Sequence, residues 1–289
     1  MIKPLTPAKK ALAIILPAVL FYAITLVFSC KTITVRTYNA ETSLFAEGGS
    51  VKLVLVSDLH STVYGKDQEP LIQMITEQEP DLILLTGDIF DSGAPMTGAE
   101  LFLSKVIDIA PVYFVSGNHE FGTKKIREIR NMLDSVGVRI LYDEYVNIEI
   151  DGNEIILAGI EDPVKQIFEI KSYNQNASME ANFRELDNIE KYKILLSHKP
   201  ERIEYFKNFS FDMVLSGHTH GGQVRIPYLV NGFYAPGQGL FPKYGGGMYE
   251  HENLVHIISR GLSLRPVMFP RIFNPPELVV IIIKSNRSA

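Results

Sequence analysis

Residues 51–60 read VKLVLVSDLH and contain the two features on which the interpretation of the whole chain depends. Apart from Lys52, Val51 to Val56 is an apolar run, and such a run is typical of a strand buried on both faces of a sheet. Directly after it come a small residue, Ser57, and then Asp58 and His60. Ligands of open α/β sheets collect beyond the carboxyl ends of the strands, so a carboxylate and an imidazole at this position indicate a functional site.

The same arrangement recurs four more times along the chain. The further apolar runs expected to be strands are 82–85, 112–115, 194–196 and 213–215. Each is followed by a small residue and then by polar side chains, which are Asp88, Asn118 with His119, His198, and His218 with His220. The stretches with helical spacing are 69–78, 99–109, 123–136 and 179–190. This alternation predicts an α/β domain in which five strand ends bring these side chains to one edge.

The residue types at these strand ends indicate a metal site. Carboxylates, imidazoles and one amide, without a thiolate, suit divalent Mn, Fe, Co or Zn. The ligands are numerous enough for two ions. Two-metal sites hold their ions about 3.5–4 Å apart and stabilise the attacking and the leaving oxygen of a displacement at phosphorus. One carboxylate must then bridge the ions, and Asp88, central in the order, is the expected bridge. Each motif taken alone could be an ordinary turn, and only their common position favours the metal site.

Composition excludes several classes of protein. The 289-residue chain is 46% apolar and 21% charged, which is typical of a globular protein and excludes a disordered one. Its net charge of −5 argues against a broad nucleic-acid interface, because such interfaces depend on many Lys and Arg side chains, so we expect no nucleic-acid partner. The single cysteine, Cys30, excludes an internal disulfide and a thiolate metal cluster.

The N-terminal region predicts membrane attachment. Residues 11–29 (ALAIILPAVLFYAITLVFS) carry no charged side chain and are long enough for a transmembrane helix. Three lysines precede this segment and two basic residues follow it closely, which weakly favours an N-terminus inside the cell. The predicted organisation is a cytoplasmic basic N-terminus (1–10), a transmembrane signal anchor (11–29), a tether (30–50) with a strand in 32–38, and a folded domain (51–289). The expected location is the cell membrane, crossed once, with the domain outside the cytoplasm.

Two alternatives to the signal anchor remain open. A cleaved signal peptide is disfavoured by the length of the apolar segment and by the lack of an Ala-x-Ala site. Residues 27–30 (VFSC) are similar to a bacterial lipoprotein cleavage box, with Cys30 as the lipid-bearing residue, although Phe28 is bulky for that pattern. Cys30 can equally be an ordinary thiol at the membrane edge.

The strand-end motifs together resemble the signature of the calcineurin-like metallophosphoesterases. The matching motifs are Asp58-x-His60, Gly87-Asp88-x-x-Asp91, Gly117-Asn118-His119-Glu120, His198 and Gly217-His218-Thr219-His220. Further features are similar to the membrane-anchored bacterial branch of that family, and these are Gly221-Gly222-Gln223, Ser259-Arg260-Gly261 and Pro276-Glu277. The resemblance extends over 51–283. It implies the metallo-dependent phosphatase fold, with mixed β-sheets sandwiched between helices in α-β-β-α layers.

The resemblance also implies roles for these residues. One ion would be held by Asp58, His60, Asp88 and His220, and the other by Asp88, Asn118, His198 and His218. His119 would donate a proton to the leaving oxygen, and Asp91 would orient its ring, which agrees with what a general acid needs. The implied reaction is hydrolysis of a phosphate monoester, diester or pyrophosphate by a hydroxide that bridges the ions, without a covalent phosphoenzyme.

The substrate is less well defined than the reaction. Arg260 and Arg265 are candidates for binding a substrate phosphate, with a structural ion pair as the alternative for each. The apolar N-terminus favours a lipid-linked or cell-envelope substrate. The alternatives are the same site acting on nucleotides or phosphoproteins, and a metal-binding scaffold without turnover. No protein partner is predicted.

Overall fold

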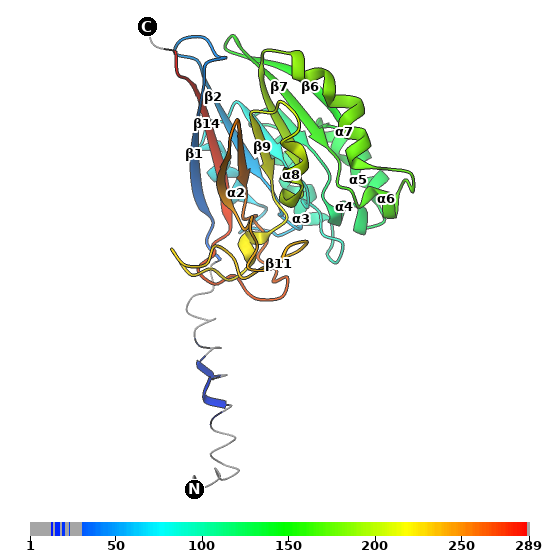
Figure 1. The fold of residues 1–289 in the computed structure, drawn as a ribbon. Coiled ribbons are helices and arrows are strands. Elements are labelled where there is room, and N and C mark those ends of the chain that lie inside the picture. The colour runs from blue at the N-terminus through cyan, green and yellow to red at the C-terminus, as the bar shows by residue number, and fades with distance from the viewer. Residues whose placement is uncertain (1–12, 14, 18, 21–22, 24–30, 288–289) are drawn as a thin grey trace.

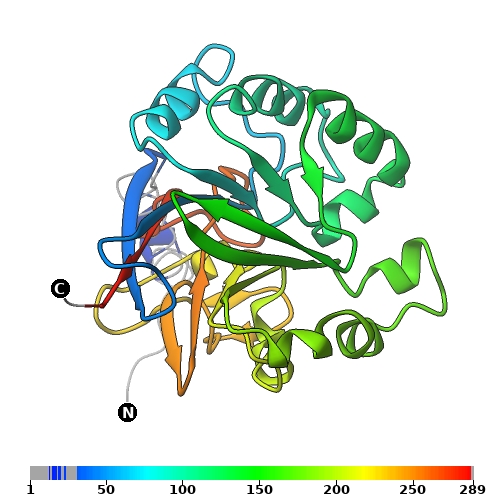
Figure 2. The ribbon, with the colours of Figure 1, turned by 90° about the horizontal axis from the view of Figure 1, so that it is seen from above.

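A computed structural model of the chain describes residues 13, 15–17, 19–20, 23 and 31–287. In this part of the chain two six-stranded sheets lie face to face, and helices cover the outer face of each (Figures 1 and 2). A short additional pair is formed by β10 (Tyr234–Ala235) and β11 (Gly239–Leu240). The layer order is therefore α-β-β-α, and the expected fold class is confirmed for the domain.

The first sheet contains the strand of the opening motif. Its order is β1 (Thr34–Thr42), β14 (Glu277–Ser285), β2 (Ser50–Val56), β3 (Leu82–Leu85), β4 (Val112–Phe114) and β5 (Arg139–Ile140). The strands from β2 to β5 are parallel, whereas β14 runs antiparallel to β2 and parallel to β1. The sheet is therefore mixed, with its parallel part on the side that carries the motifs.

The second sheet has its antiparallel pairs at the edges. Its order is β12 (Gly247–His251), β13 (Leu254–Ile258), β9 (Met213–Ser216), β8 (Tyr192–Ser197), β7 (Asn153–Ile160) and β6 (Glu144–Ile150). The inner four strands are parallel, and the outer pairs β12–β13 and β6–β7 are antiparallel.

The helices form the two outer layers and the connections at the site. They are α2 (Glu69–Thr76), α3 (Thr97–Val106), α4 (Asn118–Gly122), α5 (Ile126–Val136), α6 (Lys165–Phe168), α7 (Gln175–Phe183) and α8 (Ile203–Phe206). Three short 3-10 helices are η1 (Arg184–Asn188), η2 (Pro200–Arg202) and η3 (His220–Gly222). Seen from above, α2, α3 and α5 lie on one side of the paired sheets and α7 and α8 on the other (Figure 2).

The alternation of side chains along β2 explains why its sequence is apolar from Leu53 onward. Leu53 and Leu55 point between the two sheets, where they join the central apolar cluster. Val54 and Val56 point the other way and pack in the cluster beneath the outer helices, together with Phe102 of α3. Both faces of the strand are buried from Leu53 to Val56, and its polar residues, Ser50 and Lys52, lie at its less buried beginning.

The structure extends several of the expected elements and adds others. The strand expected in 32–38 runs from Thr34 to Thr42 and pairs with β14, so this part of the expected tether belongs to the first sheet. The helix expected over 179–190 begins earlier, at Gln175, and ends as η1. The β6–β7 pair, β13 and β14 were not among the expected strands.

The expectations for the N-terminus largely concern residues that the structure does not describe. The predicted cytoplasmic segment 1–10, Cys30 and most of the predicted anchor 11–29 lie outside the described residues. Within the described residues, none of the helices combines the length and the apolar character needed to span a bilayer.

Candidate metal centre

The strand-end side chains converge at one end of the sandwich, the lower end in Figure 1. Asp58 follows β2, Asp88 follows β3 and His198 follows β8. Backbone hydrogen bonds join the loops that follow neighbouring strands. The amide of Asp58 donates to the carbonyl of Gly87 (3.1 Å), and the amide of Gly217 donates to the carbonyl of His198 (3.1 Å). The parallel order of the strands thus places ligands from distant segments on a common frame.

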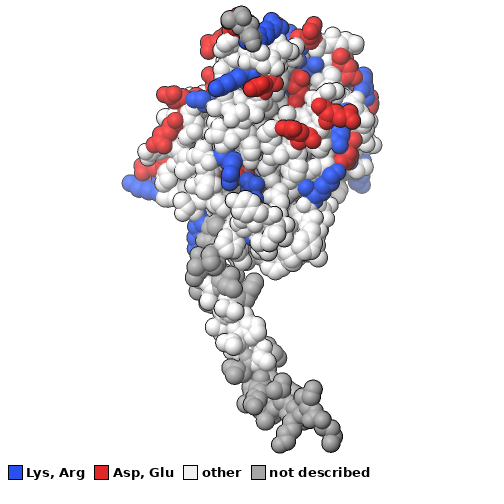
Figure 3. Space-filling view, turned by 60° about the vertical axis from the view of Figure 1, so that its left-hand side comes forward, with Lys and Arg blue, Asp and Glu red and all other residues white. Residues whose placement is uncertain are grey.

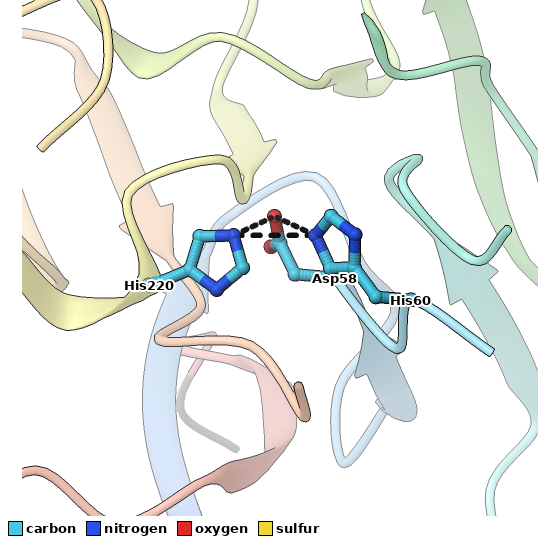
Figure 4. A group of neighbouring side chains, drawn as sticks. All are labelled: Asp58, His60 and His220. Atoms are coloured by element: carbon cyan, nitrogen blue, oxygen red, sulfur yellow. Dashed lines mark hydrogen bonds and ion pairs between the residues drawn. The ribbon is translucent and has the colours of Figure 1, made fainter. Parts of the chain in front are cut away.

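Asp58, His60 and His220 form the first group of candidate ligands (Figure 4). The Nε2 atoms of the two histidines lie 3.2 Å apart, and both face Oδ1 of Asp58, at 4.0 Å for His60 and 3.6 Å for His220. The Asp58 carboxylate is held in place by the hydroxyl of Ser57 (2.6 Å) and the amide of His218 (3.0 Å). Two imidazole nitrogens directed at one fixed carboxylate oxygen form a donor set that suits a divalent cation.

Asp88, His198 and His218 form the second group. Nε2 of His198 lies 3.2 Å from Oδ2 of Asp88 and 3.1 Å from Nδ1 of His218. Nδ1 of His198 lies 2.7 Å from the carbonyl oxygen of Thr86, and a hydrogen bond there requires the proton on Nδ1. This contact engages Nδ1 and leaves Nε2 as the nitrogen that faces the centre, as is usual for a metal-binding histidine.

Asp88 connects the two groups. Its Oδ2 lies 3.2 Å from Nε2 of His198 and 3.6 Å from Nε2 of His60, which belongs to the first group. Its Oδ1 accepts a hydrogen bond from the amide of His119 (2.8 Å). Asn118, the expected amide ligand, lines the same cavity, and its Oδ1 is buried without a hydrogen-bond partner among the described residues. The residues therefore fit two ions that share one carboxylate.

The ligands are held in an unusual backbone conformation. Five of them have positive φ angles, in the left-handed region that non-glycine residues seldom adopt. The angles are 50° for Asp58, 49° for His60, 53° for Asp88, 71° for His218 and 49° for His220. Such residues persist only where the surrounding structure enforces them, and they cluster at functional sites. The adjacent glycines make room for them, because a Cβ at Gly217 would collide with the hydroxyl of Ser57. This signal is not visible in the sequence.

The charges of the buried centre are strongly perturbed. Burial raises the pKa of Asp58, whereas the neighbouring His198 and His60 hold the pKa of Asp88 well below its usual range in spite of burial. Burial lowers the pKa of His198, but the carboxylates of Asp88 and Asp58 outweigh this effect and raise it to about 10. Burial lowers the pKa of His220 well below its usual value, so this ring is neutral at pH 7 and can act as a ligand.

His119 lies at the rim of the centre, with its side chain 33% exposed. Its ring packs edge-on against His60, with centroids 4.4 Å apart. Its Nδ1 accepts a hydrogen bond from the amide of Ser92 (3.3 Å) and lies 3.1 Å from the hydroxyl of that residue. Because Ser92 contacts Nδ1, Nε2 is the ring nitrogen that can face a leaving group, and a proton donated from it would come from the protonated ring.

Asp91 was expected to orient His119, and the structure shows a wider role. Its Oδ1 lies 3.7 Å from Nδ1 of His119, beyond hydrogen-bond range, and Ser92 makes the closer polar contacts with that ring. Its Oδ2 lies 3.6 Å from Nδ1 of His60 and accepts a 2.8 Å hydrogen bond from Arg265. Asp91 therefore connects the metal ligands to Arg265 and influences His119 by charge.

The two arginines proposed for substrate binding occupy different places. Arg265 is half exposed and lines the cavity above the metal ligands, a volume of about 330 Å³. Arg260 is buried: its Nη1 donates to Glu277 (2.7 Å), its backbone amide donates to the same carboxylate (2.9 Å), and its Nη2 donates to the carbonyl of Gly246 (3.3 Å). The expectation that Arg260 binds substrate was wrong, because its guanidinium is committed to a structural ion pair.

Glu120, the last residue of the Gly117–Glu120 motif, has a structural role that the sequence did not assign. It is fully buried, and its carboxylate accepts hydrogen bonds from the amides of Asp88 (2.9 Å), Gly117 (2.8 Å) and Phe90 (3.0 Å). Burial and the nearby Asp88 raise its pKa to about 7. Glu120 thus joins the loop after β3 to the loop after β4 and fixes the backbone from which Asp88 projects.

Comparison with known proteins agrees with this geometry. The family model for calcineurin-like phosphoesterases matches residues 51–222, which is more than half of the chain. The chain belongs to this family. It is therefore a metallophosphoesterase, a hydrolase of phosphoester bonds with a two-metal site.

Similar proteins occur in distant bacteria. An uncharacterized metallophosphoesterase of Aquifex aeolicus is 28% identical over 262 residues, which cover 87% of this chain and 92% of that protein. The phosphodiesterase YaeI of Escherichia coli is 32% identical over 195 residues, covering 64% of this chain and 66% of that protein. The solved structure of the NAD nucleotidase of Haemophilus influenzae aligns with a TM-score of 0.52 at 15% identity, covering 76% of this chain and 46% of that one, and so shows a shared fold.

Proposed function

We propose that this metallophosphoesterase is a membrane-anchored phosphodiesterase that acts on lipid-linked or cell-envelope phosphoesters. The observation that carries the hydrolytic part is the position of Asp88, whose carboxylate joins two ligand groups directly beside His119. The similarity to a phosphodiesterase supports the choice of a diester.

The ligand set defines what the metals would contribute. Asp58, His60, Asp88 and His220 would hold one divalent ion, and Asp88, Asn118, His198 and His218 the other. Two ions in these positions would lower the pKa of water and neutralise charge on the phosphoryl oxygens. We propose direct attack by water, without a covalent phosphoenzyme.

The residues around the ligands supply the remaining functions. The protonated ring of His119 would donate its Nε2 proton to the leaving oxygen and become neutral, since Ser92 contacts Nδ1. Arg265 would bind a phosphoryl oxygen of the substrate, because its half-exposed guanidinium faces the same cavity and Asp91 fixes one of its nitrogens. The other guanidinium hydrogens remain available for a phosphoryl oxygen.

A second cavity supports a substrate with an apolar group next to the phosphorus. It has a volume of about 620 Å³ and shares His60, Arg265 and Pro266 with the metal cavity. Most of its other lining is apolar or small, including Val63, Pro95 and Leu264. A phosphodiester has two organic groups, and the two adjoining cavities provide a place for each.

The membrane attachment rests on the sequence. Residues 11–29 carry no charged side chain, and Ile15, Leu16, Val19 and Leu20, which are helical, are exposed. Exposed apolar side chains on a helix are suited to lipid. We propose a single-pass anchor with the domain outside the cytoplasm, and a lipid on Cys30 as the alternative form of attachment.

The experiment is to load the full chain with Mn²⁺ and measure its hydrolysis of a bis-aryl phosphodiester, an aryl phosphate and a lipid pyrophosphate. We expect the diester to be hydrolysed faster than the monoester and activity to be lost on chelation. With unsubstituted phenol as the leaving group, we expect the rate to be about 10²–10⁴-fold lower in His119→Ala. His251→Ala is the matched control, because His251 lies outside the metal cavity. Full metal occupancy without hydrolysis of any compound, or equal rates in wild type and His119→Ala, would contradict the proposal.

A further inference from the structure

Exposed apolar side chains gather on two loops next to the metal cavity. The docking loops, as we name them, are residues 224–243 and 264–273. Tyr228 and Leu229 at the tip of the first are 107% and 81% exposed, and Phe241 of the same loop is 63% exposed. Val267 and Met268 of the second loop are also exposed. Large apolar side chains this exposed and this close together are characteristic of an interaction surface.

The two docking loops form one platform. The amide of Arg225 donates to the carbonyl of Ile272 (3.0 Å), and the amide of Ile272 donates to that of Gln223 (3.1 Å). The ring of Phe233 packs edge-on against Phe241 and Phe269, with centroids 5.4 and 5.5 Å apart. These contacts bridge the loops, so the exposed residues belong to a common surface.

This platform borders the opening of the metal cavity. Pro236 of the first docking loop, and Pro266 and Val267 of the second, line that cavity together with the metal ligands. Whatever covers the platform therefore lies next to the substrate position.

The charge of the platform differs from that of the rest of the chain. Neither Asp nor Glu occurs in 223–249 or in 261–276, whereas the whole chain has a net charge of −5. Of the four basic residues in these ranges, Arg271 is buried, and Lys243 and Arg265 each face a carboxylate. Figure 3 shows the same contrast on one face, where the lower end of the domain is largely uncharged and acidic residues gather above it. An apolar surface without acidic residues can approach an anionic lipid surface without charge repulsion, unlike the acidic remainder of the domain.

The chain also enters the domain at this end. Ile33 is buried in the same cluster as Leu262, and the amide of Thr34 donates to the carbonyl of Pro276 (2.9 Å), so β1 begins beside the second docking loop (Figure 1). Thr34 is five residues after Ser29, the last residue of the uncharged segment. Five residues span at most about 18 Å. A membrane that holds the uncharged segment is therefore within reach of the platform.

We infer that the docking loops insert into the interfacial region of an anionic membrane and bring the mouth of the metal cavity to the level of the lipid headgroups. This inference rests on the attachment proposed above and adds a second, independent contact with the lipid. Tyr and Phe side chains such as those of Tyr228 and Phe241 suit the membrane interface. The phosphoester of a membrane lipid would then reach the metals without leaving the bilayer surface.

The chain has no tryptophan, which makes the test direct. Tyr228→Trp and Phe241→Trp each introduce a single fluorescent reporter in the platform, and Phe168→Trp introduces one at a similarly exposed position on α6, away from the loops (Figure 1). The full chain is reconstituted in vesicles of phosphatidylethanolamine and phosphatidylglycerol, with and without lipids brominated on the acyl chains. Flotation and hydrolysis of a soluble aryl diester are measured on the same samples.

We expect brominated lipid to reduce the emission of both platform reporters and to leave that of Phe168→Trp unchanged. Chains that float with the vesicles while neither platform reporter is quenched would overturn the docking and leave the anchor intact. Quenching of all three reporters alike would also overturn it. A third outcome would overturn it as well: in detergent, the platform reporters become more shielded from solvent as the protein concentration increases. A second copy of the chain would then cover the surface. The soluble-diester rate shows separately whether each variant is folded and whether the phosphoesterase proposal holds.

Discussion

Oδ1 of Asp91 lies 3.7 Å from Nδ1 of His119, too far for a hydrogen bond but close enough for the carboxylate to stabilise a positive charge on the ring. His119 is therefore held by Ser92 and influenced electrostatically by Asp91, which makes separate predictions for the two residues.

Replacing His119 by Gln removes the proton donor and is expected to lower kcat by about 10²–10⁴-fold for substrates with a poor leaving group. The loss is expected to be much smaller for a nitrophenyl leaving group, which departs without a proton. Asp91→Asn is expected to reduce kcat less than His119→Gln does. Steady-state rates over a series of leaving groups measure this dependence, and an equal loss for good and poor leaving groups would rule out proton donation by His119.

Replacing Arg260 by Gln is predicted to destabilise the fold. The substitution leaves the buried carboxylate of Glu277 without its charged partner, and breaking a buried ion pair in this way costs about 3–5 kcal/mol. Urea denaturation measures the loss of unfolding free energy. The double substitution Arg260→Gln with Glu277→Gln is expected to recover part of it, and the absence of any loss in the single variant would contradict the buried pair.

Replacing Arg265 by Gln is predicted to act on substrate binding. Its side chain is half exposed, so the unfolding free energy should change by less than about 1 kcal/mol. Loss of one charge-assisted contact with a phosphoryl oxygen should raise KM by about tenfold or more. Arg265→Lys should recover only part of the effect, because it lacks the guanidinium fork. An unchanged KM in Arg265→Gln would place the substrate elsewhere.

His256 is predicted to make the fold sensitive to acid. Burial lowers its pKa to about 3, with a further contribution from His251, whereas the unfolded chain has the ordinary histidine value of 6.5. Between these values the unfolded state binds a proton that the folded state does not, so stability falls as the pH drops below 6.5. Relative to His256→Gln, the wild type should lose about 2 kcal/mol more between pH 7 and pH 5.

Urea denaturation of both proteins across this pH range gives the comparison, and titration of other groups cancels in the difference. Parallel pH profiles for the wild type and the variant would show that His256 does not stay neutral in the fold.

The metal ligands could be predicted because each follows a short apolar run, and parallel strands bring such positions together. The expected helices and the five strands that carry the motifs also appear. The apolar residues of these strands are buried in the sheets, and those of the helices are buried on the face that packs against a sheet. β6 was missed because EYVNIEI contains no continuous apolar run, and its partly exposed side chains lie at a sheet edge. β14 inserts between β1 and β2, and this pairing joins residues more than two hundred positions apart.

The structural arginine shows a different limit of sequence reasoning. Arg260 and Arg265 lie five residues apart in one glycine- and proline-containing loop region, and their chemistry is the same. Only the fold reveals that Glu277 faces the first and Asp91 faces the second. The contact of Ser92 with His119 and the left-handed backbone at the ligands also depend on three-dimensional geometry that residue types do not encode.

The most direct test of the central claim is anomalous diffraction from crystals of the protein grown with Mn²⁺. The account predicts two peaks about 3.5–4 Å apart, one bound by Asp58, His60 and His220, the other by His198, His218 and Asn118, with Asp88 touching both. A single peak at which Asp88 contacts only one ion, or none at this end of the sheets under full loading, would contradict it.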